Sequence, residues 1–151
     1  MPATGVCRRL REKPAVTQPR VMRMASTDLS EIYRGYIACL NGQDWPNLRK
    51  FVHEDVWYNS AHVGLSGYRQ MLEGDFRAIP DLHFDIALLI CEPPRVACRL
   101  QFDCRPTGLL FGMAVNGRRV QFAENVFYEF LDGRIRHVWS IIDKAAIAAQ
   151  L

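Results

Sequence analysis

The chain has 151 residues, of which 49% are hydrophobic and 23% are charged. This length and balance indicate one soluble globular domain with a substantial core, and they exclude a disordered or fibrous protein. No apolar run reaches the roughly 18 residues that a membrane-spanning helix needs, so we expect no membrane partner.

The formal charge of +3 is unevenly distributed along the chain. The first 24 residues carry six Lys or Arg and a single Glu, which leaves a net charge of −2 for the remainder. The folded part is therefore mildly acidic and gives no electrostatic reason to expect binding of nucleic acid.

Residues 1–24 show no hydrophobic period and contain three prolines. This composition predicts a disordered tail, or an upstream start codon with the true start at Met22 or Met24. The stretch is also rich in Arg and poor in acidic residues, which leaves a transit peptide open as the other reading. Residues 25–151 are then expected to form the single domain.

Five cysteines without a C-x-x-C pair indicate free thiols in a cytoplasmic protein. Cys98 and Cys104 fall in a predicted strand and are interpreted as small packed residues. The histidines His53, His62 and His83 lack the spacing of metal ligands, and there is no glycine-rich phosphate loop. We therefore expect neither a metal nor a cofactor.

Three helices are predicted in the first half of the chain. The first begins with Asp28 and Glu31 as a capping pair and ends at Asn41–Gly42. A short second helix is expected from Asp44 to about Val52, and a third from a Ser66 cap to a stop at Pro80. The apolar stripe of the first helix includes Leu29, Ile32, Tyr33, Tyr36, Ile37 and Leu40. The hydroxyl of Tyr36 needs a partner if it is buried, so this side chain can also face a cavity.

Five strands are expected from alternating apolar residues. One, over residues 56–60, interrupts the helices; three follow over 82–90, 95–104 and 120–130; the last covers 135–141 and precedes a short helix capped by Asp143. Four of these strands are long and antiparallel. This order predicts an α+β fold, a curved antiparallel sheet with helices on one face, whose cone-shaped interior can hold a ligand.

The C-terminal hairpin, with its turn at Asp132-Gly133, places polar groups in apolar rows. Glu124 falls in the same row as Val120, Phe122, Val126, Tyr128 and Phe130. His137 occupies a similar place beside Ile135, Trp139 and Ile141. A carboxylate in such a row is costly unless it is paired, neutralised or used, so these strands are typical of a pocket wall.

Three motifs carry a resemblance to a known family. They are Ile79-Pro80-Asp81-Leu82, Gly117-Arg118-Arg119-Val120, and Phe130-x-Asp132-Gly133-x-Ile135 with Trp139. From about Asp28 to Leu151 the chain resembles the SnoaL-like polyketide cyclases, which have the nuclear transport factor 2-like fold. Its ending Ile142-Asp143-Lys144-Ala145-Ala146-Ile147 is similar to a sub-branch known as ester cyclases.

The resemblance implies cofactor-free ring closure of an aromatic-polyketide ester, in which a carboxylate removes a proton α to a carbonyl. Two residues depart from the family pattern: Pro106 stands where the cyclases have His, and Val126 where they have the catalytic Asp. Glu124 lies two residues upstream on the same face, about 6–7 Å away along a strand. Either the carboxylate is displaced or the cyclase chemistry is lost. Asn59 matches a polar position of the family that points into the pocket.

The candidate catalytic residues are Glu124 and His137. Glu124 is either a general base or the partner of Arg99 in an ion pair; His137 is either its partner acid or a wall residue. The candidate substrate-binding residues are Asn59, Arg99, Tyr36 and Trp139. The sequence thus predicts a SnoaL-like cyclase or related lyase or isomerase acting on a small apolar carbonyl ligand. The alternative is a non-catalytic ligand-binding or dimerisation module.

A homodimer through the sheet is expected, because families of this fold commonly pair in that way. If Arg99 points inward toward Glu124, then Val96, Cys98, Leu100 and Phe102 point outward. Such an apolar row would favour a partner subunit over bare water.

Overall fold

The computed structural model describes residues 25–151, and the expectations for residues 1–24 lie outside the described part of the chain. Its helices are α1 (Ser26–Asn41), the 3-10 helix η1 (Trp45–Lys50), α2 (Gly64–Ala78) and α3 (Lys144–Ala148). Its strands are β1 (Val52–Tyr58), β2 (Ala61–His62), β3 (Asp85–Glu92), β4 (Arg95–Cys104), β5 (Leu109–Leu110), β6 (Met113–Ala114), β7 (Val120–Leu131) and β8 (Arg134–Ile142). Within this range no helix is both long and apolar enough to cross a membrane.

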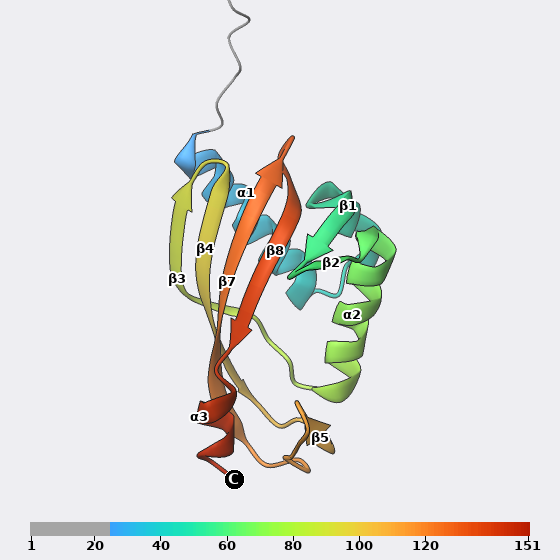
Figure 1. Ribbon diagram of the computed structural model, residues 1–151, viewed down its shortest axis with the longest axis vertical. Coiled ribbons are helices and arrows are strands. Elements are labelled where there is room, and N and C mark those ends of the chain that lie inside the picture. The colour runs from blue at the N-terminus through green and yellow to red at the C-terminus, as the bar shows by residue number, and fades with distance from the viewer. Residues whose placement is uncertain (1–24) are drawn as a thin grey trace, which may run out of the picture.

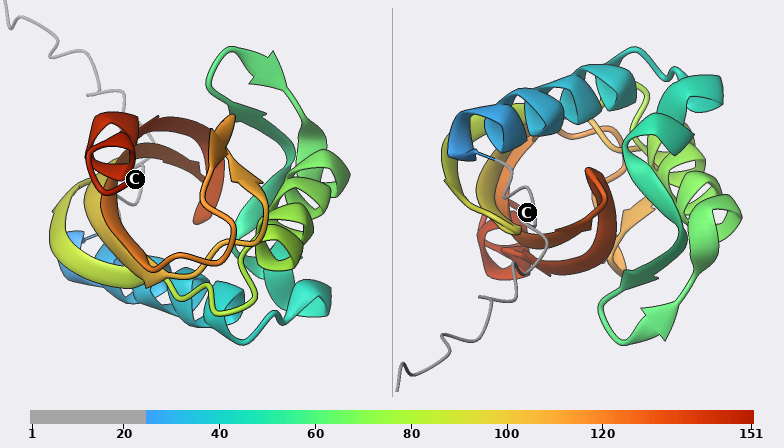
Figure 2. Two further views of the ribbon diagram at one scale, coloured as in Figure 1. Left: turned by 90° about the horizontal axis from the view of Figure 1, so that it is seen from below. Right: turned by 90° about the horizontal axis from the view of Figure 1, so that it is seen from above.

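A curved six-stranded sheet in the order β2-β1-β8-β7-β4-β3 forms one wall of the molecule (Figure 1). Figure 2 shows the sheet bending around the interior, with α1 and α2 across its open side. The predicted α+β fold and the four long antiparallel strands are confirmed. The parallel pairing of β1 with β8 was not predicted, because nothing in the local pattern of β1 specifies its partner.

Helix α1 buries the predicted stripe against the concave side of the sheet. Four residues of this stripe are almost fully buried from solvent: Leu29, Tyr33, Tyr36 and Leu40. The helix begins at Ser26, so Asp28 lies in its first turn and is not the cap that was expected. At the other end the Gly42 N–H donates to the Ala38 carbonyl, which confirms the predicted stop.

The register of β4 against β7 decides which side chains face the interior. Leu100 lies opposite Glu124 and Arg99 lies opposite Asn125, and opposed residues in a sheet point to the same side. The buried row of β4 is Val96, Cys98, Leu100, Phe102 and Cys104. The prediction that this row points outward is therefore wrong. The two cysteines of the strand are packed free thiols, as predicted.

A β-bulge in the β7–β8 hairpin changes the facing of β8. The turn residues Asp132 and Gly133 have φ angles of 52° and 75°, as a type I′ turn requires. Phe130 pairs with Ile135, but Glu129 pairs with His137, so Arg136 is an extra residue in β8. A one-residue shift moves every following side chain to the opposite face. Beyond the bulge the residues that share the inward face with β7 are Val138, Ser140 and Ile142.

The segment between β4 and β7 forms the small β5–β6 hairpin (Figure 1). Its turn is Phe111-Gly112, with φ angles of 49° and 79°. The Thr107 N–H and hydroxyl both donate to the Ala78 carbonyl, at 2.9 and 3.2 Å, and tie this segment to the end of α2. The hairpin therefore lies at one end of the interior.

Candidate active site

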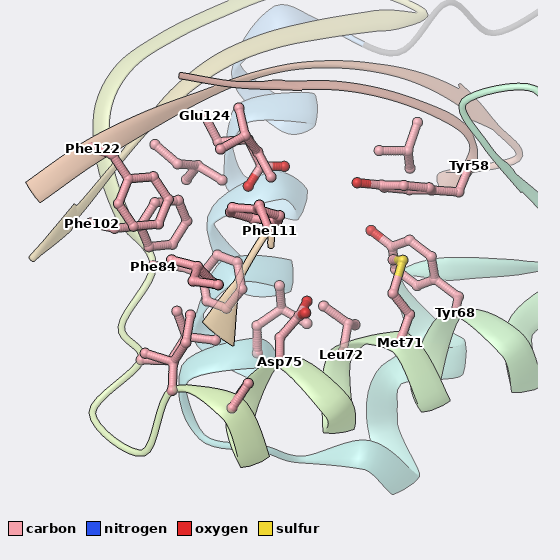
Figure 3. A pocket seen from close by; sticks show the side chains of 18 of the residues that line it. Tyr58, Tyr68, Met71, Leu72, Asp75, Phe84, Phe102, Phe111, Phe122 and Glu124 are labelled. Carbon is pink, nitrogen blue, oxygen red and sulfur yellow. The ribbon is translucent and has the colours of Figure 1, made fainter. Parts of the chain in front are cut away.

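A cavity of about 270 Å³ lies between the concave face of the sheet and helices α1 and α2. Its walls are mostly apolar and aromatic (Figure 3). Two carboxyl groups face it, Glu124 and Asp75, while no Lys, Arg or His is among the described residues that line it. Within residues 25–151 the site is thus a hydrophobic chamber whose acidic groups face no basic side chain.

Glu124 projects from β7 into the chamber, as the alternation of the strand predicted. The Ser140 hydroxyl on β8 donates a hydrogen bond of 2.6 Å to Glu124 Oε1. Burial raises the pKa of Glu124 above its ordinary value of 4.5, and the Ser140 hydrogen bond partly offsets this because it stabilises the charged form. The carboxylate is therefore held in place and made more basic than an exposed glutamate.

Asp75 faces Glu124 from the opposite wall. Figure 3 shows the two carboxyl groups projecting into the cavity from α2 and β7. The Asp75 side chain is accessible to solvent, but the space it faces is this chamber. Burial and then the charge of Glu124 raise the pKa of Asp75 from 3.8 to about 6.

Tyrosines from four elements, α1, β1, α2 and β7, supply the other polar groups of the chamber. The Tyr36 and Tyr68 hydroxyls are 2.6 Å apart and hydrogen-bonded, and the Tyr33 hydroxyl donates to that of Tyr128 at 3.2 Å. The Tyr58 hydroxyl points into the same space (Figure 3). Burial raises the pKa of Tyr36, Tyr58 and Tyr128 above the ordinary value, so these groups stay neutral in the working pH range.

One end of the chamber is lined by a cluster of phenylalanines. The ring of Phe102 is 5.4 Å from Phe84 and 5.1 Å from Phe122, in edge-to-face and stacked arrangements respectively. Phe111, from the β5–β6 turn, also lines the cavity, and the Lys144 ammonium lies 5.2 Å from its ring centroid. This end favours a flat apolar ligand.

Of the six predicted site residues, the structure brings only Glu124 and Tyr36 to the cavity. The expected inward positions of His137 and Trp139 are wrong, because the bulge at Arg136 turns both to the outer face. There the His137 ring stacks on Trp139 at 5.1 Å and on Trp57 at 5.9 Å.

Asn59 and Arg99 also lie outside the cavity. Asn59 is exposed and left-handed at φ 51°, and its Oδ1 accepts a hydrogen bond of 3.0 Å from the Ser140 N–H. It directly follows the last residue of β1 and does not line the chamber. Arg99 donates to Asn125 Oδ1 at 3.0 Å on the outer face. The hypothesis of a Glu124–Arg99 ion pair is therefore wrong.

Sequence reasoning missed several polar residues of the site, among them Asp75 and Ser140. Asp75 occurs at helical spacing within the apolar stripe of α2 formed by Tyr68, Met71, Leu72 and Ile79. The signal that identified Glu124, a carboxylate in an apolar row, was thus present there as well. Ser140 gave no comparable signal, since simple alternation assigned it to the opposite face of β8.

The curved sheet closed by helices over an apolar, acid-bearing chamber defines a cone-shaped domain of the nuclear transport factor 2-like class. A family model described as SnoaL-like polyketide cyclase matches residues 30–151. The chain belongs to this family.

The solved structures agree with this assignment. A SnoaL-like polyketide cyclase from Agrobacterium tumefaciens is 47% identical, with a TM-score of 0.81, over 84% of this chain and 98% of that one. TsrD from Streptomyces laurentii is 20% identical over 84% and 96% of the two chains, with a TM-score of 0.74. AclR from Streptomyces galilaeus is 21% identical over 83% and 96%, with a TM-score of 0.69. The two distant structures show the fold alone. A search of curated proteins gave no match.

Proposed function

We propose that this protein is a cofactor-independent SnoaL-like cyclase, or a related lyase or isomerase, that removes a proton α to the carbonyl of a small apolar compound. Glu124 is the general base. The observation that carries the proposal is the setting of this carboxylate: it lies in a hydrophobic chamber, is hydrogen-bonded by Ser140, and faces no basic residue among those described.

The setting of Glu124 suits proton abstraction from carbon. A base works best when its pKa is closer to the working pH, and burial raises the pKa of Glu124 in that direction. The Ser140 hydroxyl holds Oε1, while Oε2 has no hydrogen-bond partner within residues 25–151. Oε2 is therefore the oxygen that takes the proton.

The proposed reaction balances without an external reagent. The α C–H bond breaks, its proton goes to Glu124, and the electron pair makes the carbonyl group an enolate. In a cyclase the enolate carbon then attacks a second carbonyl of the same molecule and forms the ring C–C bond. The new alkoxide takes the proton back from Glu124, which restores the carboxylate.

The cavity volume supports a small substrate. Pockets for drug-sized ligands span roughly 300–1,000 Å³, and this chamber of about 270 Å³ lies just below that range. Its phenylalanine end suits one or two aromatic rings. We therefore place the substrate among compact aryl ketones or esters.

The alternative function, a non-catalytic module of the same fold, would be favoured by a chamber plugged with side chains. The chamber is open, although the polar groups that meet Glu124 are Asp75 and tyrosines instead of Asn59, Arg99 or His137. A measurement of catalytic turnover distinguishes the two functions.

The test is exchange of the α protons of 2-tetralone, a compact aryl-fused ketone, in heavy water, followed by proton NMR. We expect the protein to accelerate exchange above the buffer rate, and Glu124→Gln to slow it by about 10² or more. His137→Gln, on the outer face, is the matched control and should exchange at the parental rate. No acceleration by the parent protein, or equal rates for Glu124→Gln, would contradict the proposal.

A further inference from the structure

Deprotonation by Glu124 leaves negative charge on the carbonyl oxygen, and the chamber needs a group that receives this charge. Basic side chains cannot serve, because the described lining contains none. The remaining proton donors are the tyrosine hydroxyls and the carboxyl group of Asp75 in its acid form.

The tyrosines are poor donors of a whole proton. Burial raises the pKa of each tyrosine that lines the chamber, Tyr36, Tyr58, Tyr68 and Tyr128, above the already high tyrosine value. Two of these hydroxyls, on Tyr36 and Tyr68, are moreover bonded to one another at 2.6 Å. They can orient a ligand oxygen, but the transfer of a proton near neutral pH needs a stronger acid.

Asp75 has the opposite setting to Glu124. The Ser140 hydrogen bond favours the charged form of Glu124, whereas no hydrogen bond within residues 25–151 favours the charged form of Asp75. The charge of Glu124 also opposes ionisation of Asp75. Two carboxyls in such different settings suit the roles of a base and an acid.

We infer that Asp75 is a second catalytic group of this chamber, an acid that donates its proton to the carbonyl oxygen of a neutral ligand while Glu124 takes the α proton. The inference rests on the proposed function and names its ligand class: a neutral ketone or ester, held between two opposed walls. Neither an anion nor a cation is the preferred ligand.

The two proton transfers balance. As the α C–H bond breaks toward Glu124, the Asp75 O–H bond breaks and its proton bonds to the carbonyl oxygen, which gives an enol and an Asp75 carboxylate. When the enol carbon attacks a second carbonyl, the enol proton returns to Asp75 and the C=O bond forms again. The new alkoxide receives the proton held by Glu124.

The groups that face Asp75 set the expected pH dependence. The titratable residues lining the same space are Glu124, Tyr36, Tyr58, Tyr68 and Tyr128. Glu124 and Asp75 are the carboxyl groups of this set, and burial keeps the tyrosines neutral in the working pH range. A neutral ketone should bind most tightly while Asp75 is protonated. Its affinity should decline as the pH rises through about 6.

The binding test uses 2-tetralone and its cationic isostere 2-aminotetralin, titrated by NMR into the full chain at about pH 5 and pH 8. We expect 2-tetralone to bind about tenfold more weakly at the higher pH, from the loss of one hydrogen bond and exposure of the carbonyl to a carboxylate. Asp75→Asn should bind the ketone equally at both pH values, since the amide donates but does not titrate. Glu73→Gln, a carboxyl of α2 paired with Arg69 outside the cavity, should keep the parental pH dependence.

The same binding test in Glu124→Gln separates this inference from the proposed function. Because the Glu124 charge raises the pKa of Asp75, this variant should keep pH-dependent binding with a midpoint moved to lower pH. If exchange of 2-tetralone fails but this binding pattern holds, deprotonation by Glu124 is wrong, and of the inference only the hydrogen bond from protonated Asp75 to the ketone stands. The inference would be overturned by absent ketone binding at pH 5, by a flat pH profile in the parent, or by an unchanged profile in Asp75→Asn. Tighter binding of 2-aminotetralin than of 2-tetralone at pH 5 would also overturn it.

Discussion

Ser140 and Glu124, on adjacent strands, are joined by a hydrogen bond of 2.6 Å inside the chamber. The contact exists because the bulge at Arg136 shifts the facing of β8 by one residue. It connects an irregularity of the hairpin with the protonation state of the proposed base.

Ser140→Ala removes the donor that favours the charged form of Glu124. The pKa of Glu124 should therefore rise further, because its burial is then unopposed. NMR titration with labelled glutamate carboxyls measures this directly. Ser60→Ala, an exposed serine outside the cavity, is the control and should leave the titration of Glu124 unchanged. A lower pKa in Ser140→Ala would show that the hydroxyl accepts rather than donates.

Asp75→Asn should stabilise the protein above pH 6 and leave its stability unchanged below pH 4. A carboxyl whose folded pKa is raised, here from 3.8 to about 6, gives stability that is present below the unfolded value and is lost as pH rises toward the folded one. The full shift corresponds to about 3 kcal/mol, but the solvent that reaches Asp75 reduces this to about 1 kcal/mol.

For a chain of this length, such a change in free energy corresponds to a rise of about 2–4 °C in melting temperature. Thermal unfolding followed by circular dichroism at about pH 4 and pH 7.5 measures it. Asp85→Asn, on an exposed position at the start of β3, is the matched control and should show no such difference. A lower melting temperature for Asp75→Asn at neutral pH would mean that the carboxylate makes a stabilising contact.

The part of the fold that follows from local periodicity could be predicted from the sequence. Helix α1, the long strands and the inward row of β7 with Glu124 all follow from spacing alone. Which residues of β8 face the chamber could not be predicted. One extra residue at Arg136 reverses the facing of the strand, and no residue type marks a bulge. The place of Asp75 in the site could also have been predicted from the sequence, because Asp75 interrupts the apolar stripe of α2 in the same way that Glu124 interrupts the apolar row of β7.

We propose that the protein forms a homodimer through the outer face of the sheet, although with different residues from those expected. The exposed apolar side chains on this face are Leu88 at 55%, Ile90 at 56%, Phe127 at 53%, Trp139 at 39% and Ile141 at 67%. Phe127 pairs directly with Trp139 across β7 and β8, near the middle of the face. A partner that covers this surface would remove it from water.

Phe127→Glu should therefore shift the protein to monomer. An isologous interface contains the substitution twice, so we expect dissociation to become easier by at least about 30-fold, as for loss of a central aromatic residue. Sedimentation velocity across micromolar concentrations measures it. Leu109→Glu, at a position that is also exposed but lies on the β5–β6 hairpin, should leave the dimer intact. A monomeric parent protein would refute the dimer.

Phe111 should control how fast a ligand leaves the chamber. Its side chain lines the cavity from the β5–β6 turn and is 44% exposed, so it lies where the chamber meets solvent. A φ of 49° is unfavourable for phenylalanine and ordinary for glycine. Phe111→Gly should keep or slightly raise the melting temperature, because it relieves the backbone while removing the ring.

The same variant should bind 2-tetralone about fivefold more weakly, the usual worth of one aromatic contact, with most of the change in the dissociation rate. NMR line shapes during titration give both quantities. Leu109→Ala, two residues earlier on the same hairpin and not in the cavity wall, controls for general loosening of the hairpin and should leave both unchanged. An unaltered dissociation rate in Phe111→Gly would show that the ligand leaves by another path.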